Sequence, residues 1–369
     1  MKRFLSIVVS AVLLCSCAKT GESKVEGASH KVQPHFCEVN EVVSVAMYLA
    51  GAEEYNWSEY SDYINDIDEY FAPFKDHELI KSIESYHGGG FGYDLPMGLA
   101  HRLKIVDGEV IARDNVVPDT VNYYKRISPM METVAIEQIN DFYKVSDFHT
   151  FYEQHKALYQ EAEAAFRKIT DSIDLAWFDQ FFFPDSTVKF DVVLSIINGP
   201  ANYSTTIDWT DGTKSIVSTM GCCDPDTLGL PVYDLLSTLP VLIHEWCHGY
   251  CNPLIDEYWE GIEPVAQKYF EIDADFFTRG AYPAATYMMH ETFVEASVVR
   301  YLKSHPIDCS EFGIDDLAEF YLKAEGEENK HYQLERCIVE TLDARVNNPT
   351  QYPTMRDFMP EIVKALQKK

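Results

Sequence analysis

Two histidines and a glutamate lie within a short apolar stretch, VLIHEWCHGYCNP, at residues 241–253. Polar side chains buried beside apolar neighbours such as Leu242 and Trp246 cost free energy unless each has a partner. His244 and His248 are four positions apart, so on a helix their imidazoles project from one face with Cβ atoms about 5–6 Å apart. Both rings can then bind a single metal ion, and zinc is the ion that fits such ligands best.

Glu245 completes an H-E-x-x-H pattern. On a helix it is rotated about 100 degrees from His244, so it cannot easily bind the same ion, but it can reach a water molecule on that ion. The sequence therefore predicts a zinc site with His244 and His248 as ligands and Glu245 as the general base. The alternative is two buried histidines that hydrogen-bond to backbone carbonyls, with Glu245 at the surface.

A catalytic zinc ion has three protein ligands and one open position, so a third ligand is needed. The segment MMHETFVEASVVRYL at residues 288–302 offers Glu291 and Glu295, which share one face of a predicted helix. His290, next to Glu291, is expected to point elsewhere on that helix. The two glutamates could instead form a solvated acidic face, or Glu295 could be the ligand.

HEWCH followed on a later helix by a Glu-x-x-x-acid pair resembles the gluzincin metallopeptidases, the thermolysin-like group. The resemblance implies that Glu291 binds zinc and that Glu295 orients a ligand histidine and fixes its tautomer. A looser similarity extends over most of the chain, through EYFAPFKDHELI, YDLPMGLAHRL and HGYCNP, to a family of uncharacterised bacterial lipoproteins with a predicted gluzincin-like site. Glu291 follows His248 by 43 positions, which leaves room for an inserted loop.

A rival ligand set uses cysteine. Cys251 lies three positions after His248, so His244, His248 and Cys251, completed by Cys222 or Cys223, could form a closed structural zinc site. Such a site has no open position and predicts no activity. It also gives Glu245 no role.

If the site is catalytic, zinc lowers the pKa of its bound water to about 7, and Glu245 removes a proton as the water attacks a polarised carbonyl. The developing oxyanion needs a further donor. Tyr282, Tyr287 and Arg300 are the candidates by position, although each could equally serve packing. The segment SIINGPANY at residues 195–203 is expected to be an edge strand that binds extended substrate, or else ordinary sheet.

The surrounding pattern predicts an α+β fold that is mainly helical, with a small, largely antiparallel sheet before the zinc-binding helix, as in zincins. Helical spacing recurs at residues 40–74, 147–182, 288–302, 315–322, 332–344 and 355–368. Strand patterns cover VKFDVVLSII, NYSTTIDW and KSIVSTM, and Asp107-Gly108 and Asp211-Gly212 predict turns. HGGGFGYD, at residues 87–94, predicts a turn. The zinc-binding helix is expected to start near Val232 and end at Asn252-Pro253.

The N-terminus predicts export. A charged start, an apolar run of signal-peptide length and LCSC make residues 1–17 resemble a lipoprotein signal peptide and lipobox, with Cys17 as the lipidated residue. The alternative is a soluble secreted protein cleaved nearby. Residues 18–35 are expected to be a flexible tether. A helical part at 36–185 and a zincin-like catalytic part at 186–369 follow, either as two parts or packed together as one unit.

Composition limits the partners. A net charge of −29 makes nucleic acid a poor partner, because nucleic-acid binders need a positive surface. The acidity favours basic substrates, or serves only solubility. Seven cysteines follow Cys17, an odd number, and mostly buried thiols with one or two disulfide bonds are expected.

Together these features predict a lipid-anchored, zinc-dependent peptidase in the bacterial cell envelope, facing the periplasm or exposed at the cell surface, that acts on peptide or protein substrates. The alternatives are a non-enzymatic binding lipoprotein with structural or absent zinc, and a zinc amidase that acts on cell-wall peptides.

Overall fold

The structure is a computed structural model that describes residues 31–87, 90–120, 122–222, 224–279, 284–324, 330–348 and 350–369. Residues 31–369 form one compact unit. The predicted signal peptide, Cys17 and residues 18–30 of the predicted tether lie outside the described residues. The last residue of that predicted tether, His35, lies in the short strand β1 (His35–Phe36).

The protein is α+β and mainly helical, as predicted. A four-stranded sheet has the order β1-β4-β6-β5, where the longer strands are β4 (Val188–Ser195), β5 (Tyr203–Asp208) and β6 (Lys214–Gly221). Two short hairpins pair β2 (Leu103–Val106) with β3 (Glu109–Ala112) and β7 (Asp224–Pro225) with β8 (Pro231–Val232). The Asp107-Gly108 and Asp211-Gly212 turns join β2 to β3 and β5 to β6, as expected.

The pairing in the main sheet differs from the largely antiparallel arrangement expected. β4 pairs in parallel with both β1 and β6, and only β5 and β6 are antiparallel. The chain between β4 and β5 passes over one strand position, so that β6 returns between them. That connecting segment includes the buried Ile196, Ile197 and Asn198 and is not a strand, so SIINGPANY does not form the expected edge strand. The edge strands are β1 and β5.

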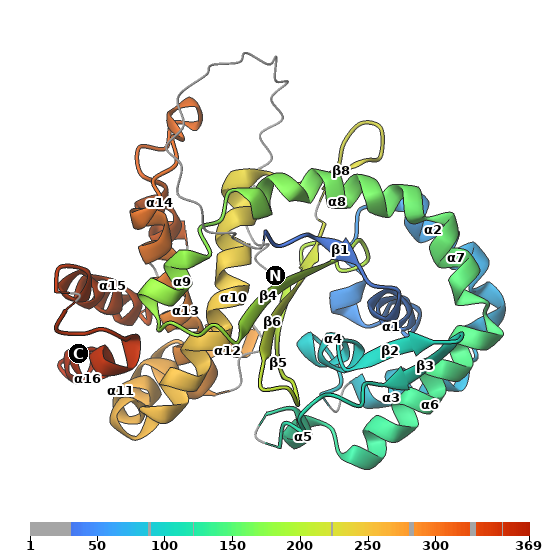
Figure 1. Ribbon diagram of the computed structural model, residues 1–369, viewed down its shortest axis with the longest axis horizontal. Helices are drawn as coiled ribbons and strands as arrows, with labels where there is room; N and C mark the ends of the chain where they lie inside the picture. Colours follow the sequence, from blue (N-terminus) through green and yellow to red (C-terminus); the bar gives the residue numbers. More distant parts are fainter. Residues whose placement is uncertain are drawn as a thin grey trace. The chain divides into compact units, whose positions relative to one another are not determined.

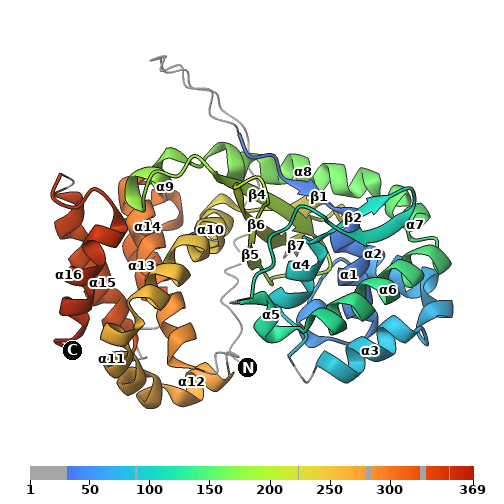
Figure 2. The same ribbon diagram turned by 60° about the horizontal axis from the view of Figure 1, so that its bottom comes forward.

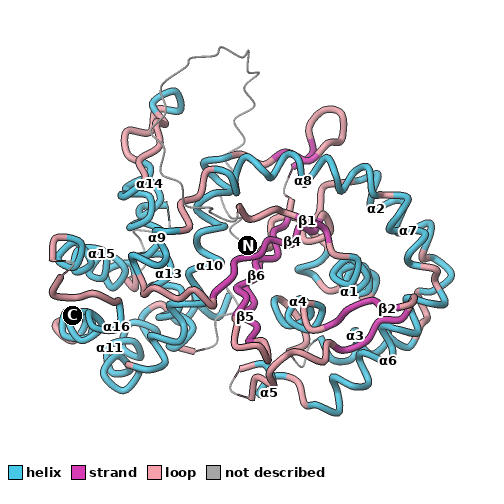
Figure 3. Tube along the Cα trace, viewed as in Figure 1, coloured by secondary structure: helices cyan, strands magenta, loops and turns pink. Residues whose placement is uncertain are grey.

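Helices cover both faces of this sheet (Figures 1 and 2). The helices before β4 are α1 (Glu38–Leu49), α2 (Ser61–Tyr70), α3 (Glu78–His87), α4 (Asp94–Ala100), α5 (Tyr123–Arg126), α6 (Pro129–Val145), α7 (Phe148–Gln154), α8 (Lys156–Asp171) and α9 (Ala176–Phe181). The helices after β8 are α10 (Leu235–Glu257), α11 (Trp259–Ile272), α12 (Ala274–Arg279), α13 (Ala285–Ser304), α14 (Leu317–Ala324), α15 (Tyr332–Val346) and α16 (Met355–Leu366). Figure 3 shows β4, β5 and β6 between α10 on one side and α1 and α4 on the other.

Successive side chains of β4 and β6 point to opposite faces of the sheet, and this explains how the sheet joins the two sets of helices. Phe190 packs its ring 4.7 Å from Trp246 of α10, and Ile216 packs against Gly249 of the same helix. The next residue on each strand points to the opposite face, which α1 and α4 cover. One continuous hydrophobic core therefore includes both faces of the sheet.

Candidate metal centre

Helix α10 carries the H-E-x-x-H pattern and packs directly on the sheet. Its N-terminus is fixed by Asp234, whose carboxylate accepts hydrogen bonds from the backbone N–H groups of Leu236 and Ser237. The helix continues to Glu257, so the prediction that Asn252-Pro253 ends it is wrong. The residues after the proline include the buried Leu254 and Ile255, whose burial offsets the lost backbone hydrogen bond.

Gly249 sets the distance between α10 and β6. A Cβ atom at this position would lie 2.4 Å from Cδ1 and 2.7 Å from Cγ1 of the buried Ile216. Only glycine permits this approach without a shift of the neighbouring groups. Because His248 is the preceding residue, the close packing at Gly249 also fixes the height of His248 above the sheet.

Helix α13 lies alongside α10 (Figure 2). The ion pairs between them show that the two helices run antiparallel. Glu295 reaches His244, and Glu291, one turn earlier on α13, reaches both His244 and His248. The interval between the two helices is filled by α11 and α12, so the long spacing from His248 to Glu291 corresponds to an inserted helical segment.

The three predicted ligands converge. Nε2 of His244 lies 3.1 Å from Nε2 of His248 and 3.3 Å from Oε2 of Glu291, and Nε2 of His248 lies 3.8 Å from Oε1 of Glu291. Tetrahedral zinc with bonds of about 2.0–2.1 Å separates its ligand atoms by about 3.3 Å. The donor atoms therefore already have the spacing that a zinc ion requires.

The remaining ring nitrogens have partners that orient both imidazoles. Oε1 of Glu295 lies 2.8 Å from Nδ1 of His244, and Oδ1 of Asn252 lies 3.1 Å from Nδ1 of His248. Hydrogen bonds at Nδ1 leave the lone pairs of the Nε2 atoms free for a metal ion. Asn252 follows His248 by one helical turn, and the sequence prediction missed its role because it interpreted Asn252-Pro253 only as a helix end.

Burial and neighbouring charges shift the pKa values of the site residues in opposite directions. Burial opposes protonation of His244, but the carboxylates of Glu295 and Glu291 outweigh it and raise the pKa of His244 well above its usual value. Burial lowers the pKa of His248, and it raises the pKa of Glu245, the residue after His244, to about 7. For Glu291, burial favours the neutral acid, but the two histidines lower its pKa overall. A cation between the histidines would act against protonation of both rings.

The described residues do not assemble the rival cysteine site. Among them, the candidate metal-ligating group is His244, His248 and Glu291, with no fourth histidine, cysteine, aspartate or glutamate. Cys251 Sγ lies 3.5 Å from the Ser297 hydroxyl, and Cys222 Sγ lies 2.8 Å from the hydroxyl of Tyr60. Cys223 is outside the described residues. Thiols outside disulfide bonds include Cys37, Cys247, Cys251, Cys309 and Cys337.

The predicted oxyanion donors have different positions. Arg300 does not reach the site, because its guanidinium pairs with Asp343 of α15 at 2.6 Å. Tyr287 is half-exposed on α13, one turn before Glu291, and its ring makes an edge contact with the ring of His290. Tyr282 lies outside the described residues. His290 points away from the ligand group, as expected, and its Nε2 lies 2.8 Å from Oδ1 of Asp256 on α10.

Two further residues that act on the site, one acidic and one aromatic, come from segments that precede α10. The negative charge of Asp94, at the start of α4, acts on both Glu245 and Tyr203. Tyr203 begins the edge strand β5. Nothing in the spacing of the sequence links either residue to the H-E-x-x-H helix, because only the sheet brings α4 and β5 beside α10.

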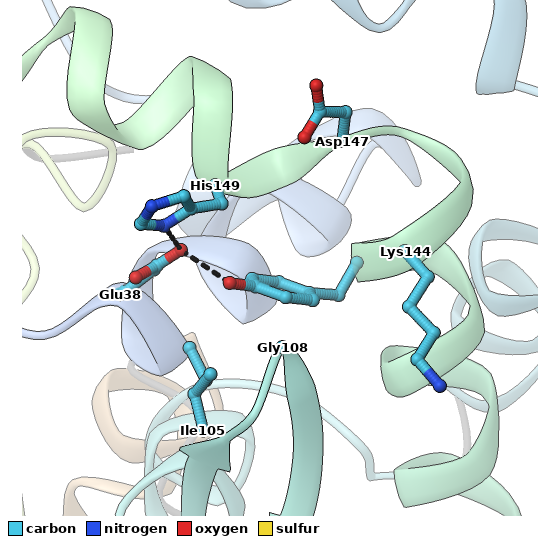
Figure 4. A pocket seen from close by; sticks show the side chains of 7 residues that line it. Glu38, Ile105, Gly108, Lys144, Asp147 and His149 are labelled. Atoms are coloured by element: carbon cyan, nitrogen blue, oxygen red, sulfur yellow. Dashed lines mark hydrogen bonds and ion pairs between the residues drawn. The ribbon is translucent and has the colours of Figure 1, made fainter.

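A cavity of about 440 Å³ lies elsewhere in the molecule (Figure 4). Its lining residues come from α1, the β2–β3 hairpin, α6 and α7, and include Glu38, which accepts hydrogen bonds from Tyr143 and His149. None of the candidate metal ligands lines it.

Within the described part of the chain, no helix combines the length and apolar character needed to cross a lipid bilayer. A family model described as "Domain of unknown function (DUF4932)" matches residues 52–365. No curated protein and no solved structure matches the chain. Because the family match covers most of the chain and includes His244, His248 and Glu291, the chain belongs to this family, Domain of unknown function (DUF4932).

Proposed function

We propose that this protein is a zinc-dependent peptidase of gluzincin type. The observation that carries the proposal is the convergence of the Nε2 atoms of His244 and His248 with the carboxylate of Glu291 at ligand spacing, with Glu245 beside them on α10. Three donors without a fourth among the described residues are typical of a catalytic rather than a structural zinc site.

His244, His248 and Glu291 would hold the ion, and Glu295 and Asn252 would keep the two imidazoles in the ligating tautomer. When bound, zinc supplies a Lewis acid that acidifies water and polarises a carbonyl group. Glu245 is 7% exposed, and its burial raises its pKa to about 7, which suits a group that takes up and releases a proton near neutrality.

The residues of the chain then divide the work of hydrolysis. The Glu245 carboxylate takes a proton from the attacking water as the water oxygen bonds to the peptide carbonyl carbon. It returns that proton to the amide nitrogen as the carbon–nitrogen bond breaks. Tyr287 is the donor candidate nearest to the ligands along α13.

Glu245→Gln tests the function, because the amide keeps the shape of the side chain but cannot act as a base. Purified wild type and variant are assayed for zinc content and for cleavage of a broad peptide library by mass spectrometry. We expect both proteins to bind one equivalent of zinc and the variant to lose about 10²- to 10⁴-fold in cleavage rate. Equal cleavage by both proteins, or no cleavage by zinc-loaded wild type, would contradict the proposal.

We further propose that Cys17 carries a lipid anchor that places the peptidase in the cell envelope, on the basis of the lipobox alone. Detergent-phase partitioning of the full chain tests this. The wild type should enter the detergent phase, and Cys17→Ser should remain in the aqueous phase.

A further inference from the structure

A strained tyrosine, Tyr93, precedes α4. Tyr93 has φ 54° and ψ −119°, a conformation that glycine adopts readily and other residues rarely adopt. The buried Glu54 holds it there, because its carboxylate accepts a hydrogen bond from the Tyr93 backbone N–H and also contacts His87. The Tyr55 hydroxyl donates to the Tyr93 carbonyl at 2.8 Å. Such strain persists only where surrounding groups enforce it, and it concentrates at functional sites.

The enforced turn determines where the next residue, Asp94, lies. Asp94 forms a two-pronged ion pair with Arg126 of α5, with nitrogen–oxygen distances of 2.5 and 2.9 Å. Both side chains remain about 40% exposed, at 42% for Asp94 and 38% for Arg126. The pair fixes the orientation of the carboxylate and leaves part of its oxygen surface open to a ligand.

Asp94 and Glu245 lie on opposite sides of the edge strand β5. A Cβ atom added at Gly98 of α4 would lie 3.8 Å from the Thr205 side chain of β5, on the face opposite α10. Glu245 stands on α10, which packs on β5 and β6 from the other face. Tyr55 joins the Tyr93–Asp94 turn to the start of this strand, because its hydroxyl donates to the Tyr93 carbonyl and its ring lies 6.0 Å from the ring of Tyr203. Across the same strand, the charge of Asp94 contributes to the raised pKa of Glu245.

A buried hydroxyl without a partner lies in the same region. Tyr203 is only 8% exposed, and its hydroxyl forms no hydrogen bond with the described residues. The charges of Asp94 and Glu245 both act on it. Buried hydroxyls in folded proteins usually have a hydrogen-bond partner, so the Tyr203 hydroxyl is suited to bind a polar group of a ligand.

We propose that Asp94, positioned by Arg126 and by the Tyr93 turn, recognises a cationic group of the substrate next to the bond that is hydrolysed. The group is an ammonium or guanidinium ion, from a basic side chain or from a free amino terminus. A substrate extended along β5 presents successive side chains alternately to the α10 face and to the α4 face, where Asp94 lies. The inference rests on the proposed peptidase function.

The test uses four fluorescein-labelled octapeptides that contain either arginine or its neutral isostere citrulline, each with a free or an acetylated amino terminus. Binding is measured by fluorescence polarisation with zinc-loaded Glu245→Gln protein, so that no turnover is needed. The same peptides are digested by wild type. Asp94→Asn is compared with Asp94 intact, and Asp114→Asn is the matched control, because Asp114 is an exposed aspartate that also forms an ion pair, with Lys104 of β2.

We expect a cationic peptide to bind about fivefold or more tightly than its neutral counterpart, and Asp94→Asn to abolish this ratio while Asp114→Asn leaves it unchanged. Arginine against citrulline reports a basic side chain, and free against acetylated reports the amino terminus. A ratio that Asp94→Asn leaves intact would mean that the overall acidity of the protein is responsible, and it would overturn the inference.

The two proposals fail separately. Cleavage of all four peptides at equal rates would leave the peptidase function standing and remove the role of Asp94. Charge-selective binding that depends on Asp94, together with no cleavage by zinc-loaded wild type, would support recognition of a cation by Asp94 and contradict the peptidase function.

Discussion

Oε1 of Glu295 lies 2.8 Å from Nδ1 of His244, on the side of the ring opposite the other two ligands. This contact holds the imidazole so that Nε2 faces His248 and Glu291. The carboxylate therefore acts on the metal centre through the histidine, and its removal should weaken metal binding without unfolding the protein.

Glu295→Gln is expected to lower zinc affinity by about 10- to 100-fold, which is the usual effect of losing such a hydrogen-bonded partner. Competition with a fluorescent chelator measures the affinity. Glu263→Gln, an exposed glutamate on α11, is the control and should bind zinc like wild type. Wild-type affinity in Glu295→Gln would show that the contact does not orient the ligand.

Zinc should also stabilise the folded protein, because its ligands converge only when α10 and α13 are docked. A thousandfold excess of free zinc over the dissociation constant adds about 4 kcal/mol to the free energy of unfolding. We expect the melting temperature to fall by several degrees on chelation and to recover on addition of zinc. Glu291→Gln should show a much smaller zinc-dependent shift, measured by differential scanning calorimetry.

Gly249→Ala should disturb the metal centre from the opposite side of α10. The added Cβ meets Ile216, and overpacking of this kind costs about 1–3 kcal/mol, against about 1 kcal/mol gained in helix propensity. We expect lower stability in urea denaturation and weaker zinc binding. The double variant Gly249→Ala with Ile216→Val, which removes Cδ1, should recover part of both. Full stability in the single variant would show that the contact is not tight.

Two buried groups, Glu41 of α1 and His101 at the end of α4, should give opposite pH dependences of the free energy of unfolding. Burial raises the pKa of Glu41 to about 7, so the folded protein retains a proton that the unfolded chain loses above about 4.5, and this contribution falls as pH rises from 4.5 to 7. Burial lowers the pKa of His101 to about 3, so its contribution is lost as pH falls from 6.5 towards 3.

The effect of each group on the pH dependence of the free energy of unfolding should be visible once the other group is substituted. Glu41→Gln mimics the neutral acid and should be more stable than wild type at pH 7.5, by roughly 3 kcal/mol, with little difference at pH 4.5. His101→Gln should remove the loss on the acid side. Urea denaturation at a series of pH values measures both. Parallel pH profiles for the two variants would contradict the assignment.

The sequence was informative where a pattern is local. His244, His248, Glu291 and Glu295 could be placed from helical spacing and from the gluzincin resemblance, because residues four apart on a helix share a face whatever the rest of the fold does. The mainly helical α+β class and the strand segments are also confirmed.

The features that it did not predict depend on contacts between distant segments. The parallel pairing of β4 with β6 is set by the path of the connection after Ser195, which no local pattern encodes. The relation between Asp94 and Glu245 also follows from that pairing, because β5 then forms the edge on which α4 packs from one face and α10 from the other. The continuation of α10 through Pro253 depends on the burial of Leu254 and Ile255 against other helices.

The donors of the metal centre come from helices separated by α11 and α12, and Glu291 follows His248 by 43 positions. During synthesis the chain therefore presents both histidines well before the carboxylate that completes the set. An ion captured early would have only two protein ligands and would exchange freely, and it would be retained only after α13 docks. Release of the ion and detachment of α13 should accordingly be a single event, so that the occupancy of the site reports the integrity of this helix pair.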